Sequence, residues 1–118
     1  MSYQNGNVAI MDYTKEELDE IIETATVDAY GYDEELESWN AYLGEELAFP
    51  LPVVVMGVPA DAQAIDIRDG VAKFRVISKN KEYWISVIDA ELVNDQGEHD
   101  HDDLLLHAFR AWDVPCEG

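Results

Sequence analysis

Apolar residues recur every three or four positions through the first part of the chain, which places them on one face of an α-helix. The first helix is expected to begin at Thr14, because Thr14 and Glu17 have the spacing of a capping box. Its inner face would be Leu18, Ile21, Ile22, Ala25 and Ala29. Gly31 is a suitable left-handed stop.

A second helix is expected from an N-cap at Asp33. Its inner face would be Leu36, Trp39, Asn40, Leu43 and Leu47. Pro50 and Pro52 end it, because proline disfavours helix at the preceding residue and blocks a restart. The first two helices would therefore form a hairpin.

The pattern then changes to a period of two, which is typical of strands. Strand-like runs cover residues 52–58, 64–67, 71–78 and 82–92. Asp69-Gly70 is a hairpin turn signal between the second and third runs. In the third run, Ala72, Phe74 and Val76 share one face. Four consecutive short strands predict an antiparallel meander or a small SH3-like barrel.

A last helix is expected from Asp103 to Trp112, after a polar loop. Its inner stripe would be Leu105, Ala108, Phe109 and Trp112. The prediction is a single α+β domain over residues 1–118. Its parts would be a flexible lead (1–11), an acidic helical hairpin (12–48), a β part (50–93), and an acidic loop with the C-terminal helix (94–118).

Composition adds an extreme charge to this picture: the 118 residues carry a formal net charge of −19. Thirteen acids and one base lie between Met11 and Glu46, whereas the stretch from Leu47 to Val93 is nearly neutral. By Coulomb reasoning nucleic acid and anionic membranes are poor partners, and cations and basic proteins are good ones. With Cys116 as the single cysteine and no signal segment in the sequence, we expect a cytoplasmic location. We also expect the chain to be a monomer.

The segment around Gly31 resembles an EF-hand loop without matching it. With Gly31 at loop position 6, Asp28, Glu34 and Glu37 fall on ligand positions. The first and fifth positions are Thr26 and Tyr30, so two early oxygen ligands are missing. A calcium site here would need ligands from elsewhere in the fold.

Carboxylates suited to calcium, which takes six to eight oxygen ligands, occur at several places. Asp33, Glu34, Glu35 and Glu37 fall close together in the second helix, and Asp89 and Glu91 would share a face of the fourth strand. His99, His101 and His107 do not have the preorganised pattern of a zinc site. Enzyme motifs are absent from the sequence, so no catalytic residue is expected.

Three segments resemble the cyanobacterial calcium-binding protein family (CcbP). They are "DAYGYDEE" (Asp28 to Glu35), "FPL" (Phe49 to Leu51) and "SVIDAE" (Ser86 to Glu91), within a resemblance that covers residues 14–112. Glu35 stands where the family often has glutamine, which adds charge. Ala90 replaces the usual leucine, a change in packing.

The resemblance implies a calcium buffer that acts without EF-hands in calcium signalling during heterocyst differentiation, and that binds more than one ion. The residues carried over form a first-choice metal set and a second candidate set. The first-choice set is Asp28, Asp33, Glu34, Glu35, Glu37, Asp89 and Glu91; the second is Asp95, Glu98, Asp100 and Asp102. The alternative is an interaction protein, an acidic mimic of nucleic acid that blocks a basic groove on a partner.

Overall fold

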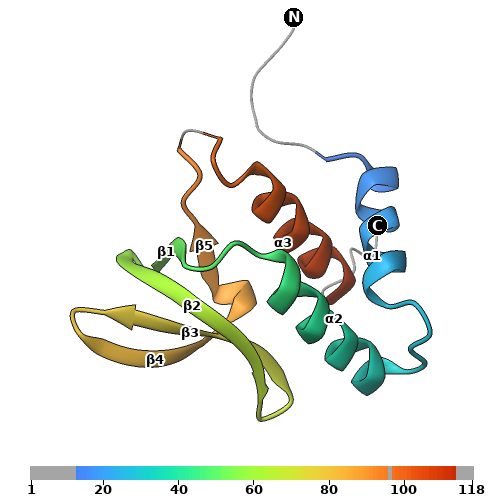
Figure 1. Cartoon of the computed structure of the whole chain (residues 1–118), viewed down its shortest axis with the longest axis horizontal. Helices are drawn as coiled ribbons and strands as arrows, with labels where there is room; N and C mark the ends of the chain where they lie inside the picture. The colour runs from blue at the N-terminus through green and yellow to red at the C-terminus, as the bar shows by residue number, and fades with distance from the viewer. Residues whose placement is uncertain (1–12, 96, 114–118) are drawn as a thin grey trace, which may run out of the picture.

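The chain folds into a group of three helices packed beside an open, twisted antiparallel sheet (Figure 1). This computed structural model describes residues 13–95 and 97–113. The predicted α+β class is confirmed. The expected flexible lead at 1–11 and Cys116 lie outside the described residues.

Helix α1 (Lys15–Ala25) begins with the predicted capping box. The Glu17 backbone N–H donates to Thr14 Oγ1 (3.0 Å), and the Thr14 N–H donates to Glu17 Oε1 (2.9 Å). The helix ends at Ala25, earlier than expected, so Gly31 is not its stop. The chain passes through Asp28 in a left-handed conformation (φ 65°) before it reaches the next helix.

Helix α2 (Tyr32–Glu46) has Gly31 as its N-cap, so the expectation of an Asp33 cap was wrong. Gly31 has φ 91° and ψ 161°, a conformation that glycine adopts without strain and other residues rarely do. The helix therefore starts one residue before Asp33. Its predicted inner residues Leu36, Trp39 and Leu43 are buried.

The sheet has the strand order β4-β3-β2-β1-β5 and does not close into a barrel. Its strands are β1 (Leu51–Val55), β2 (Val58–Arg68), β3 (Val71–Ser78), β4 (Lys81–Ser86) and β5 (Ala90–Leu92). The first four form the expected meander, each pairing with the next. The run 52–58 is interrupted by a turn at Met56 and Gly57, both with positive φ, so β2 begins earlier than predicted.

The run 82–92 is not one strand, contrary to expectation. A 3-10 turn, η1 (Val87–Asp89), breaks it after Ser86. The chain then crosses to the other edge of the sheet, where β5 pairs with β1. Alternation along the sequence is the same on both sides of this break, so it does not reveal the crossing.

The core lies between the inner face of the sheet and helices α2 and α3 (Asp100–Asp113). Trp39, Leu43, Phe74 and Leu105 are fully buried there. Helix α3 begins three residues before the predicted Asp103. Within the part of the chain that the structure describes, no helix is both long enough and apolar enough to cross a membrane.

Candidate metal centre

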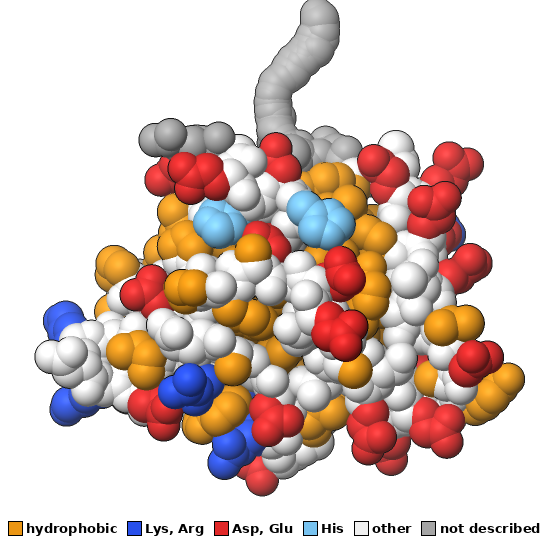
Figure 2. All heavy atoms as spheres, in the orientation of Figure 1, with side chains coloured by type: hydrophobic (Ala, Val, Ile, Leu, Met, Phe, Trp, Pro, Cys, Tyr) orange, Lys and Arg blue, Asp and Glu red, His pale blue; other side chains and the backbone are white. Residues whose placement is uncertain are grey.

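Charge is separated in space as well as along the chain. Figure 2 shows acidic side chains over the helical part and the loop before α3, with Lys and Arg gathered toward the sheet. The single base of the first third, Lys15, is already paired with Asp19 at 2.8 Å. The acidic surface therefore has little protein counter-charge of its own.

The link site is our name for Asp28, Asp33, Glu34, Glu35 and Glu37, the carboxylates at the junction of α1 and α2. Asp28 precedes Gly31, and the other four occupy the first turns of α2. All except the half-buried Glu35 are exposed. Among the described residues, none of the five has a Lys or Arg nitrogen within 4.0 Å.

Two link-site carboxylates already take part in the fold. The Tyr30 backbone N–H donates to Glu34 Oε1 (2.9 Å), which ties the loop to α2. The Trp112 indole N–H donates to Glu35 Oε1 (2.7 Å), which ties α2 to the end of α3. The helix dipole stabilises these acids in the first turn, and it also opposes any cation placed there. An ion at the link site must therefore be attracted by more than one carboxylate.

Asp113 adds an acid that sequence reasoning did not select. The Tyr32 hydroxyl donates to Asp113 Oδ1 (3.1 Å), and the Tyr32 ring stacks on Trp112 with centroids 5.2 Å apart. The end of α3 therefore lies against the start of α2. Nothing local in the sequence marks Asp113, because its hydrogen-bond partner Tyr32 is 81 residues away.

The two remaining first-choice residues are separated by the break in the fourth run. Asp89 is in η1 and Glu91 is in β5, so the expectation that they share a strand face was wrong. Both are exposed. Glu91 lies opposite Val54 of β1, at the edge of the sheet.

The second candidate set divides into exposed and buried members. Asp95, Glu98 and Asp100 are exposed, and Asp100 Oδ1 accepts a bond from the Asn94 amide (2.8 Å). Asp102 is only 4% exposed. Its Oδ1 accepts from the Ala48 N–H (3.0 Å), and its Oδ2 lies 2.9 Å from His99 Nδ1. The Asp102 carboxylate thus joins the start of α3 to the end of α2.

A further acidic group surrounds Tyr13 and was also missed. The Tyr13 hydroxyl donates to Asp103 Oδ2 (2.7 Å). Burial raises the pKa of Tyr13, and the negative charges of Asp103, Asp100 and Glu17 raise it further. Acids from the starts of α1 and α3 therefore lie near one tyrosine, and Tyr13 is 90 residues from Asp103 in sequence.

The histidines are engaged with carboxylates or backbone rather than with one another. His107 Nδ1 lies 2.8 Å from the Asp103 carbonyl oxygen, and His101 Nε2 lies 3.9 Å from Glu46 Oε1. Within residues 13–95 and 97–113, no three His, Cys, Asp or Glu side chains are arranged so that they could hold a metal ion. The donor chemistry nevertheless suits calcium, which accepts carboxylate, carbonyl and water oxygens.

Comparison with protein families indicates which ion the chain binds. The CcbP family model, described as calcium binding, matches residues 19–104. The chain belongs to the CcbP family. Its ion is Ca²⁺.

A solved CcbP structure shows the same fold. The crystal structure of Anabaena CcbP superposes with a TM-score of 0.70 at 17% identity, and the match covers 87% of this chain and 94% of that one. Comparison with curated proteins gives no match. The family match shows the family, and the structural match shows the fold.

Proposed function

We propose that this CcbP-family chain is a calcium buffer whose tightest site is the link site. One observation carries the proposal: five carboxylates lie at the α1–α2 junction with no Lys or Arg partner among the described residues. No three of them form a preformed metal site, so their side chains would have to turn towards the ion. The negative charges of such a group repel one another, and a bound divalent cation reduces this repulsion.

Asp33 and Glu34 would be the main ligands. Asp33 is exposed in the first turn of α2, with no side-chain partner among the described residues. Glu34 uses one oxygen for the Tyr30 N–H and keeps the other. Asp28, Glu35 and Glu37 would contribute charge or complete the shell, with water and backbone carbonyls as the remaining oxygens.

Affinity should be modest, in the micromolar to millimolar range, because the ligands are solvated and the dipole of α2 opposes the ion. We propose that Asp89 and Glu91 help at the edge of β5, and that Asp95, Glu98 and Asp100 form a second site. Asp102, the fourth member of the second candidate set, would support this site from the core without binding the ion, because both of its carboxylate oxygens are already engaged. We propose that the chain is a monomer that buffers calcium in the cytoplasm. It would serve calcium signalling in heterocyst differentiation.

The test compares carboxylates that differ only in position. Asp33→Asn and Glu34→Gln each remove one charge from the link site. Glu16→Gln and Glu20→Gln remove the same charge from exposed positions on α1. In a calorimetric calcium titration, each link-site variant should weaken the tightest site about tenfold, which corresponds to about 1.4 kcal/mol.

The α1 variants should bind calcium almost as the parent does. In ~0.15 M NaCl the Debye length is about 8 Å, so diffuse attraction is screened whereas directed calcium–oxygen bonds are not. If all four variants lose the same small amount of affinity, calcium merely condenses on a charged surface and the link site is rejected.

A further inference from the structure

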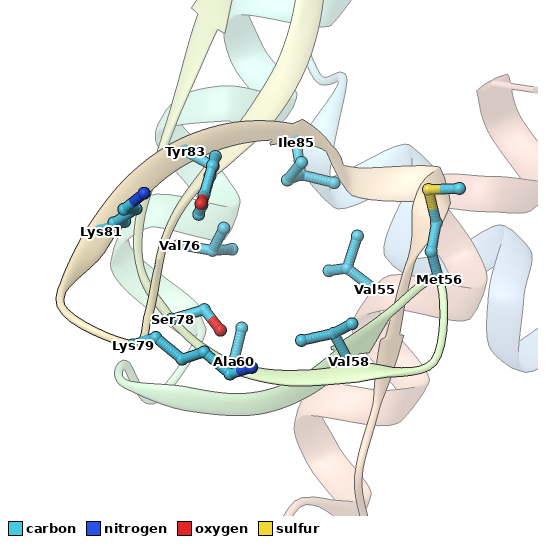
Figure 3. Close-up of a pocket in the computed structure, with 10 residues that line it drawn as sticks. All are labelled: Val55, Met56, Val58, Ala60, Val76, Ser78, Lys79, Lys81, Tyr83 and Ile85. Atoms are coloured by element: carbon cyan, nitrogen blue, oxygen red, sulfur yellow. The ribbon is translucent and has the colours of Figure 1, made fainter.

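An apolar groove lies on the inner face of the sheet, beyond the part that the helices cover (Figure 3). Its volume is about 420 Å³, within the range of ligand-binding pockets. Val55 and Val58 line one side, and Tyr83 and Ile85 of β4 line the other. Val76 of β3 forms the floor between them and continues into the core.

The groove is accessible, and three of its apolar lining residues are unusually exposed. Met56, at the tip of the β1–β2 hairpin, is 94% exposed, and Val58 and Tyr83 are each nearly half exposed. Contiguous exposed apolar surface with polar residues at its rim marks an interaction site. An exposed methionine beside a groove suits an adaptable contact with another chain.

The charge at this groove is opposite to that of the molecule. Its charged lining residues are Lys79 and Lys81, at the end away from Met56, and none of its lining residues is acidic. On a chain with a net charge of −19 this is a local reversal. An occupant that carries carboxylates at that end would be attracted, whereas a basic one would not.

The backbone beside the groove is also available. Strand β4 is an edge of the sheet, and among the described residues no strand pairs with its outer side. Edge strands present unpaired N–H and C=O groups to an incoming strand. Added strands obtain affinity from these backbone bonds, and they obtain specificity from alternate side chains that enter pockets.

We infer that this groove binds an extended segment of a partner protein, in which apolar side chains alternate with or are flanked by carboxylates. The segment pairs with the free edge of β4 and inserts its apolar side chains between β4 and the β1–β2 hairpin. Its carboxylates meet Lys79 and Lys81. This function is separate from calcium binding, because no link-site residue lines the groove.

The experiment is a selection from a phage-displayed library of random nine-residue peptides against the full chain. We expect enrichment of peptides with alternating apolar residues and at least one Asp or Glu. Lys79→Glu combined with Lys81→Glu should weaken a selected peptide by about tenfold or more, since two favourable charge contacts become repulsive. Lys73→Gln, which alters a residue on the opposite face of β3, should change little.

Backbone pairing has its own readout. Binding of a selected peptide should slow hydrogen exchange at β4 amides that do not bond to β3, and a proline at the centre of the peptide should abolish this effect. Unchanged melting temperature and calcium titration would show that the double variant is folded.

Several results would overturn the inference. They are the absence of enrichment, enrichment of basic peptides, equal binding by the double lysine variant, and binding without protection of β4. A concentration-dependent dimer abolished by the double variant would identify a second copy as the occupant instead. Peptide binding that appears only after deletion of residues 2–12 would identify the chain's own first segment instead.

Discussion

Replacing Asp102 with alanine tests whether its carboxylate holds two helices together or binds calcium. Asp102 is 4% exposed and accepts from the Ala48 N–H at 3.0 Å, with His99 Nδ1 at 2.9 Å. A hydrogen bond to a charged group contributes about 1.5–3 kcal/mol, and neighbouring bonds do not add fully. We therefore expect Asp102→Ala to lower the free energy of unfolding by about 3 kcal/mol in calcium-free buffer.

The thermal consequence follows from chain length. A domain of 118 residues has an unfolding entropy of about 0.25 kcal/mol/K, so 3 kcal/mol corresponds to a melting temperature lower by about 12 °C. The measurement is thermal unfolding by circular dichroism with EDTA present. The variant Asp100→Ala is the matched control, because Asp100 has the same charge in the same helical turn but is exposed. It should lose less than about 1 kcal/mol.

The opposite result would refute the reasoning. If Asp102→Ala melts as the parent does without calcium, and differs only when calcium is added, then its carboxylate acts as a ligand and not as a link between helices.

Three further outcomes are expected from other parts of the fold. Gly31→Ala should lower the free energy of unfolding measured in urea by about 1 kcal/mol, because φ is 91° at this position although the space around it is open. An unchanged urea midpoint would contradict this backbone conformation. The pKa of Tyr13 is raised in the folded chain, so the protonated Tyr13 hydroxyl contributes to the free energy of unfolding below pH 10, and this contribution is lost as pH rises above the ordinary tyrosine value. Tyr13→Phe should therefore flatten the decline in stability measured above pH 10, and an identical decline would count against the bond to Asp103. Trp112→Phe removes the indole donor to Glu35 and should cost about 1 kcal/mol in urea unfolding, because the contact is only partly buried; full retention of stability would show that this bond contributes nothing.

Local periodicity predicted the helices and one face of the sheet. Leu36, Trp39 and Leu43 are buried where their spacing placed them, and so are Ala72, Phe74 and Val76. The capping box at Thr14 and Glu17 was equally visible, since both partners lie within one helical turn. These features depend on contacts between near neighbours in sequence.

The crossing of the chain at η1 was not visible in the pattern. Residues on both sides of Val87–Asp89 alternate in the same way, but β4 pairs with β3 whereas β5 pairs with β1. The pairing partner of a strand depends on where other strands lie, not on its own composition. The separation of Asp89 from Glu91 follows from that long-range choice.

The sequence by itself determined that this chain has an acidic, helical part and a nearly neutral β part, because charge and hydrophobic spacing are local properties that can be read directly from the residues. Only the tertiary structure decided which acids remain free. The buried Asp102 accepts a hydrogen bond from Ala48, 54 residues away. Asp103 accepts one from Tyr13, 90 residues away. Glu35 accepts one from Trp112, 77 residues away. All three were equivalent carboxylates in the sequence. Their environments differ because chain folding brings distant donors to some of them and leaves others, such as Asp33, in water.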